Sequence, residues 1–345
     1  LIVGVTAAPW ALRAMSTPED ILGPATTYIR IYFLGVIGNL IYNMGAGILR
    51  AVGDSKRPLY FLIASCLTNI VLDIAFVIGL HMGVAGAALA TILSQALSAV
   101  LVLWVLMRTK DMHRLELRKI RFDGRMFRRI IRIGLPAGLQ SVMYTSSNIL
   151  IQSSVNELGT DTVAAWTAYS KIDSLFWMIV NAFGISITTF VGQNYGAGKP
   201  KRIWQGIKAS VLMMTIYSAF MFGVLMLGAR TFALLFVDPV EWEILKDTEL
   251  FLHISVSFFP VLGLLCILRY SIQGAGFTNL AMLSGVSEMI ARIMVSLYAV
   301  PALGYLAVCF GDPTAWIFAV IFLIPAFIYV YGRIKRMSTS GMVKY

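Results

Sequence analysis

Three carboxylic acids lie inside long apolar stretches of this sequence: Asp73, Asp173 and Glu288. The other acidic residues fall in polar segments or near their edges. A carboxylate in hydrocarbon costs at least about 2.5–3.5 kcal/mol on insertion scales, and such residues usually mark ion, proton or substrate pathways. These three acids are therefore the first residues to consider for function.

Asp73 follows Asn69 by four residues, so a carboxamide and a carboxylate share one helix face, one turn apart. Together they offer oxygen ligands to Na+, or a carboxylate that takes up a proton. Thr91, on the next apolar stretch, can add a hydroxyl. Two plainer interpretations stay open: Asn69 only satisfies a buried neutral Asp73, and Thr91 only packs between helices.

Glu288 and Arg292 form a second pair four residues apart, with opposite charges. They serve either in substrate contact or as a structural ion pair that offsets the cost of burial. For Asp173, functional and structural roles are equally open. Asn43 and Gln193 are further polar residues considered for substrate contact or gating. Nothing in the sequence suggests catalytic residues, a cofactor or any metal site other than Na+ at Asp73.

The segments that must position these residues are unusually apolar. The 345 residues are 58% hydrophobic and only 13% charged, whereas soluble domains carry about 25% charged residues. Ten stretches are long enough to cross a bilayer, and each must be a helix because lipid-exposed backbone has to satisfy its own hydrogen bonds. They are roughly 1–15, 21–50, 57–79, 83–108, 127–155, 161–192, 203–236, 247–273, 279–303 and 313–331. We therefore predict an all-α polytopic membrane protein.

The net charge of +11 does not indicate nucleic-acid binding, because the basic residues cluster by side. Ten of the 28 Lys and Arg lie between Arg108 and Arg132, and the others fall mainly in 53–58, 196–202 and the tail from Gly332. The loops predicted on the opposite side of the membrane are acidic, and Lys246 is their only basic residue. Their acids are Glu19, Asp20, Glu157, Asp161, Asp238, Glu241, Glu243, Asp247 and Asp312. By the positive-inside rule, the basic loops and the C-terminus are cytoplasmic.

The chain also contains a weak internal duplication. With an offset of 223, LRAVG (49–53) falls on IQGAG (272–276), and Arg292 falls on Asn69. The two halves agree better in the lengths of their spans and the positions of their loops than in residue identity. We expect a parallel repeat of two six-helix lobes, which is common in transporters. The predicted domains are an N-lobe (1–108, its last four helices), a basic linker (109–126), a C-lobe (127–336) and a cytoplasmic tail (337–345). On this interpretation ten of an expected twelve helices are present and the first lobe is incomplete.

Several motifs resemble the multidrug and toxic compound extrusion family, in its bacterial branch named for a DNA-damage-inducible member. GLPAGLQ (134–140) opens the fifth span, and VGQNYGA (191–197) closes the sixth like the family's glycine–glutamine signature. LRAVGD (49–54) resembles the glycine-punctuated end of the family's corresponding helix. Asn69 and Asp73 match its first-lobe cation pair, with Thr91 where a third ligand is expected. The resemblance covers essentially the whole chain.

This resemblance implies a central cavity between two lobes that opens alternately to each side. It implies a secondary antiporter that exports amphipathic or cationic compounds in exchange for H+ or Na+. It also implies that an aspartate of the family's first helix, which completes the cation site, belongs to a segment not in this chain.

The nearest alternative is a lipid-linked oligosaccharide flippase of the same superfamily, which a cavity rich in Arg and Lys would favour. A channel would need a ring of identical or similar residues around a pore, and a membrane enzyme would need a group of catalytic residues. The sequence shows neither pattern. We expect small amphipathic substrates and the lipid bilayer as partners, no nucleic acid, a monomer, and location in the bacterial inner membrane.

The orientation predicts a labelling pattern. A cysteine placed at Asp123 should react with a membrane-impermeant maleimide only from the cytoplasm, because it lies in the basic linker. A cysteine placed at Glu241 should react only from outside. Reaction of both positions from the same side would contradict the predicted membrane topology.

Overall fold

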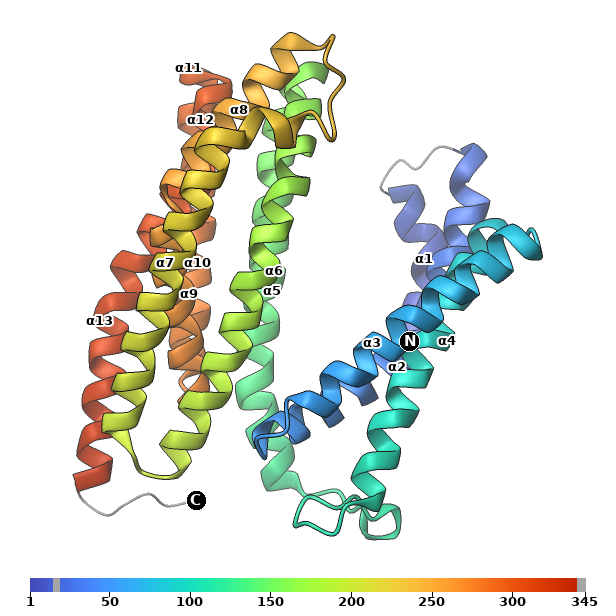
Figure 1. The fold of residues 1–345 in the computed structure, drawn as a ribbon, viewed down its shortest axis with the longest axis vertical. Helices are drawn as coiled ribbons and strands as arrows, with labels where there is room; N and C mark the ends of the chain where they lie inside the picture. The colour runs from blue at the N-terminus through green and yellow to red at the C-terminus, as the bar shows by residue number, and fades with distance from the viewer. Residues whose placement is uncertain (15–18, 340–345) are drawn as a thin grey trace. The chain divides into compact units, whose positions relative to one another are not determined.

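The computed structural model describes residues 1–14 and 19–339 and divides them into two compact units (Figure 1). The first unit ends at Phe122 and the second begins at Asp123. This boundary lies within the predicted linker (109–126). The limits given for the N-lobe (1–108) and the C-lobe (127–336) stay predictions. Of the predicted tail, residues 337–339 continue the last helix and the rest lies outside the described residues.

The described part of the first unit is a bundle of helices. α4 packs against α2 and α3, and α1 packs against α2. The Ser65 hydroxyl of α3 donates a 2.6 Å hydrogen bond to the Ser94 carbonyl of α4, and the Tyr42 hydroxyl of α2 donates one of 3.1 Å to the Pro58 carbonyl. The elements are α1 (Ile2–Ala14), α2 (Glu19–Ala51), α3 (Lys56–Asp73), the π-helix η1 (Ile74–Gly79), α4 (Gly83–Arg108) and the 3-10 turn η2 (Leu117–Lys119).

The second unit has a large aromatic core. The rings of Phe176 and Phe259 stack with centroids 3.6 Å apart, and Trp316 and Phe251 are almost fully buried. α5 packs on α10, α10 on α13, and α6 on α7, α8 and α9. The elements are α5 (Gly124–Glu157), α6 (Thr160–Gly196), α7 (Pro200–Ala233), α8 (Trp242–Ser257), α9 (Phe259–Gly274), α10 (Thr278–Met294), the π-helix η3 (Val295–Ala299), α11 (Val300–Leu303), α12 (Tyr305–Cys309) and α13 (Gly311–Thr339).

The predicted span 247–273 is a bent pair of helices. α8 and α9 meet at an angle of 50° around Phe258. Pro260 lies two residues later, where its ring and missing N–H prevent a continuous helix.

A helix stands at each predicted span, but a count of ten membrane crossings is not confirmed. Within residues 1–14 and 19–339, seven helices are long and apolar enough to cross a membrane, or eight if the bent pair is one span. α1 has only 13 residues, fewer than a span of about 17–25 requires. α5 is long enough at 34 residues, yet it carries a polar stripe that keeps it outside this set.

Matching backbone features support the internal repeat. α2 covers Glu19–Ala51, and α8 with α9 covers Trp242–Gly274, an offset of 223 at both ends. Gly53 and Gly276 both take left-handed backbone angles, with φ of 92° and 85°. The π-helices then begin at Ile74 and Val295, an offset of 221. A π-helix in the same place of each half is an uncommon feature, so coincidence is a poor explanation.

Glycine allows α6 and α9 to approach closely. A Cβ atom at Gly274 would lie 2.6 Å from the backbone carbonyl oxygen of Thr188. Because backbone cannot move aside like a flexible side chain, this crossing tolerates only glycine.

Replacing Gly274 with alanine should therefore destabilise the second unit by about 1–3 kcal/mol, the usual cost of overpacking. The measurement is thermal unfolding of the detergent-purified protein. The matched control is Gly223→Ala in the interior of α7, where a Cβ would meet no atom within 4 Å, and whose stability should be unchanged or slightly raised. Equal melting temperatures for Gly274→Ala and the parent protein would contradict the close approach of α6 and α9 at Gly274.

Candidate functional site

Polar and aromatic stripes on α5 and α6 line a cavity of about 740 Å³ in the second unit. The lining residues of α5 recur every three or four positions, so they form one helix face, and those of α6 do the same. They are Gln140, Ser141, Tyr144, Thr145, Asn148 and Gln152 on α5, and Trp166, Tyr169, Ser170, Asp173, Ser174, Trp177, Met178 and Asn181 on α6. The cavity explains why α5 is too polar to be recognised as a span.

Asp173 lies in this cavity wall with 9% of its surface exposed. Tyr169 stands one turn before it and Trp177 one turn after it on α6, and both also line the cavity. The Oδ1 atom of Asp173 is buried and has no hydrogen-bond partner within the described part of the chain. The carboxyl also interacts with the side chains of Trp177 and Tyr169 on its own helix, but a buried acceptor atom without a donor is costly, so the free Oδ1 makes this carboxyl a candidate for contact with a ligand.

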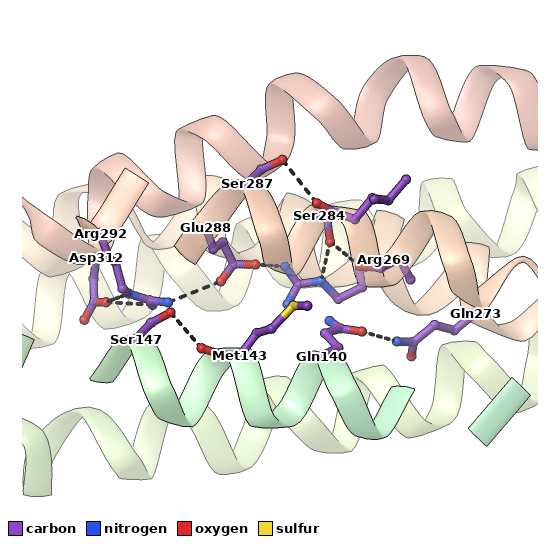
Figure 2. Close-up of polar contacts among 12 residues, drawn as sticks. Gln140, Met143, Ser147, Arg269, Gln273, Ser284, Ser287, Glu288, Arg292 and Asp312 are labelled. Atoms are coloured by element: carbon purple, nitrogen blue, oxygen red, sulfur yellow. Dashed lines mark hydrogen bonds and ion pairs between the residues drawn. The ribbon is translucent and has the colours of Figure 1, made fainter. Parts of the chain in front are cut away.

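A chain of ion pairs forms another part of the wall (Figure 2). Arg269 of α9 pairs with Glu288 of α10, and its Nε donates to the Ser284 hydroxyl at 3.1 Å. The other carboxylate oxygen of Glu288 lies 3.8 Å from the Arg292 guanidinium. Arg292 in turn donates to one oxygen of Asp312 on α13, at 2.8 and 3.1 Å.

The predicted pair of Glu288 and Arg292 is thus half of a longer network. Sequence reasoning missed Arg269, although the rule that flagged buried acids would also have flagged a lone arginine in an apolar run. It also placed Asp312 in an outer loop, which is wrong: Asp312 lies in the first turn of α13 and pairs with a side chain twenty residues away. Only the packing of α10 on α13 reveals that partner.

In the first unit, Asn69 and Asp73 lie half-buried on the last turns of α3, directly before η1. Asn69 Nδ2 and Asp73 Oδ1 are both buried without a hydrogen-bond partner within the described ranges. The Ser65–Ser94 hydrogen bond sets the register between α3 and α4, so Asn69, one turn after Ser65, lies toward Thr91 on α4. The Thr91 hydroxyl itself donates to the Ala87 carbonyl of its own helix at 2.9 Å.

The remaining predicted residues lie outside the second-unit cavity. Asn43 is exposed on α2, where its amide donates to the side chain and backbone carbonyl of Asn39. Gln193 is exposed near the end of α6 and is not among the residues that line the cavity. Their roles in substrate contact or gating stay predictions.

The ion-pair network predicts a large effect of one substitution. Glu288→Gln removes the charge between two buried arginines and should destabilise the protein by about 3–5 kcal/mol, because it leaves a buried charge uncompensated. Adding Arg269→Gln should recover much of that loss, since the double change removes both partners. The measurement is thermal unfolding in detergent, with Glu243→Gln on the exposed first turn of α8 as the matched control. A melting temperature for Glu288→Gln equal to that of Glu243→Gln would refute a structural role for the network.

Comparisons with known proteins place the chain in a family. The model of the MatE family matches residues 1–75 and 136–298. The probable multidrug resistance protein YpnP of Bacillus subtilis (strain 168) is 29% identical over 329 residues, which cover 95% of this chain and 72% of that protein. The FAD transporter of Shewanella oneidensis is 26% identical over 226 residues, 62% of this chain and 49% of that protein.

A solved structure agrees with these matches. The crystal structure of MATE in the bent conformation superposes with a TM-score of 0.87 at 22% identity, over 98% of this chain and 75% of that one. The chain thus spans about half to three quarters of the length of the proteins it matches. With most of its length matched by the family model, the chain belongs to the MatE family, the multidrug and toxic compound extrusion transporters.

Proposed function

We propose that the protein is a cation-coupled secondary antiporter that exports amphipathic, cationic compounds by alternating access. The observation that carries this proposal is the polar pair at the end of α3. Asp73 Oδ1 and Asn69 Nδ2 are buried without a hydrogen-bond partner within the described residues. A proton on the carboxyl, or a Na+ held by oxygen ligands, would satisfy this acid.

Either ion changes the charge at Asp73 by one unit. The change occurs next to η1, a π-helix, and such segments are frequent at functional sites in helices. A one-unit change beside an irregular turn can bias a helix bundle between two packings. This is the coupling step that we propose for the first unit, with Thr91 as a further ligand if its hydroxyl turns from the Ala87 carbonyl.

The lining of the second-unit cavity supports cationic rather than anionic substrates. Its two basic residues, Arg269 and Arg292, are each paired with a carboxylate. A flippase for lipid-linked oligosaccharides would need free basic groups for its phosphates, so this alternative is less well supported. Transport of an anionic dinucleotide, as in the name of the Shewanella relative, faces the same objection.

We further propose that the protein works as a monomer in the bacterial inner membrane, with basic loops and C-terminus in the cytoplasm. The clustering of ten basic residues in 108–132 supports this orientation. In this orientation, H+ or Na+ that enters the cell down its gradient would drive the substrate outward.

Replacing Asp73 with Asn in the complete protein tests the coupling step. The change removes the titratable group and nearly preserves its shape. It should abolish ion-driven efflux while leaving equilibrium binding of substrate within about tenfold, or about 1.4 kcal/mol. The measurements are ethidium efflux from energised vesicles and equilibrium binding in detergent.

The matched control is Asp111→Asn, which removes an exposed loop carboxylate of the same unit and should leave efflux unchanged. Normal gradient-driven efflux by Asp73→Asn would move the coupling site elsewhere, with Asp173 and Glu288 as the next residues to test.

A further inference from the structure

Within the second-unit cavity, one carboxyl is in excess over the basic groups. Two arginines, Arg269 and Arg292, face three acids, Asp173, Glu288 and Asp312. Arg269 is held by Glu288, and Arg292 by Asp312 and Glu288. The network is therefore balanced by itself, and Asp173 has no ion-pair partner within residues 1–14 and 19–339.

Aromatic rings surround this unmatched acid. Tyr169 and Trp177 stand one turn on either side of Asp173, and Trp166 lies beside Tyr169 with ring centroids 5.8 Å apart. Across the cavity, the Tyr144 ring of α5 meets the Trp177 ring edge-on at 6.0 Å. Ring faces attract cations as well as apolar surface.

One of these rings already binds a cation of the protein. The Arg292 guanidinium lies over the face of Tyr144, 5.1 Å from the ring centroid. Arg292 is held by an aromatic face and a carboxylate, and Asp173 with its neighbouring rings offers the same two contacts to a bound cation. A buried carboxylate without a positive partner is costly, whereas one paired with a cation is not.

We propose that Asp173 and the rings beside it form a binding site for aromatic organic cations within the second unit. The carboxylate of Asp173 pairs with the positive charge, and Trp177 and Tyr144 contact its aromatic groups. Tyr169 is 2% exposed and packs on Phe251, so it supports the wall of the site from behind. The site discriminates by charge, because an anion of equal shape would meet an excess carboxyl and two arginines already engaged. This inference rests on the proposed export of cationic compounds and names the residues that recognise them.

Tetraphenylphosphonium and tetraphenylborate test this charge discrimination, because they share one shape and carry opposite charges. Their binding to the complete protein in detergent is measured by equilibrium dialysis against empty micelles, without an ion gradient. The parent protein should bind the phosphonium at least tenfold more tightly than the borate. Asp173→Asn should reduce this preference at least tenfold, mainly by weakening phosphonium binding.

The matched control is Asp161→Asn, which removes an exposed acid from the first turn of the same helix and should keep the preference unchanged. A structural role for Asp173 alone would lower the melting temperature without changing the ratio of the two affinities. A parent protein that binds both ions equally, or an Asp173→Asn variant with the parental ratio, overturns the proposal.

If Asp173→Asn does not fold, a pair of variants at Trp177 tests the proposed cation site instead. Trp177→Leu removes an aromatic face and should weaken phosphonium binding at least threefold, while Trp177→Phe should stay within twofold of the parent. Equal binding by both overturns the proposal.

The outcome is separable from that of the proposed transport. Asp73→Asn should retain the phosphonium preference, since binding without a gradient does not need the first-unit acid. Failure of gradient-driven efflux with the preference intact would sink only the proposed antiport. Efflux by the parent without any preference that depends on Asp173 would sink only this inference.

Discussion

Buried charge that must be neutralised in pairs governs the architecture of the second unit. Arg269, Glu288, Arg292 and Asp312 come from three helices, α9, α10 and α13, and each side chain needs its neighbours to remain ionised in an apolar setting. Because Glu288 pairs with Arg269 of α9 and Arg292 pairs with Asp312 of α13, the network fixes how α10 packs against both helices. The row of contacts in Figure 2 also runs beside α5, where the Gln140 carboxamide accepts a 2.9 Å hydrogen bond from Gln273.

That arrangement leaves room for the cavity and sets its electrostatic character. The polar stripe of α5 and the aromatic stripe of α6 face the space beside the network. With both arginines engaged, the wall presents one carboxyl in excess, and the closed pairs contribute little net field. The same four side chains therefore hold the helices together and leave Asp173 as the unmatched carboxyl of the cavity wall.

The two units solve the problem of polar groups in a membrane differently at related positions. By the offset of 223, Arg292 stands where the first unit has Asn69, and by the later offset of 221, Asp312 stands where it has Thr91. In the second unit these positions hold a permanent ion pair, whose cation is a side chain. In the first unit they hold neutral groups near Asp73, whose Oδ1 has no hydrogen-bond partner among the described residues. A tethered guanidinium cannot exchange, whereas a solvent cation or proton can, and this difference is the physical reason for proposing the ion-coupling site in the first unit.

The sequence by itself determined the helical class, the membrane setting, most element boundaries to within about five residues, and the family, because apolar run length and glycine–proline punctuation are local properties. The end of the last helix was predicted at 331 and lies at Thr339. The sequence also determined that Asp73, Asp173 and Glu288 stand out, since an acid in an apolar run is conspicuous without any partner in view. The sequence predicted one partner, Arg292 for Glu288, four residues apart; tertiary structure alone decided the partners on other helices. Arg269 and Asp312 lie on other helices from Glu288 and Arg292, and no spacing rule links α9 or α13 to α10. The polar face of α5 likewise took its meaning only from packing, because the cavity that it borders is assembled from residues more than a hundred positions apart.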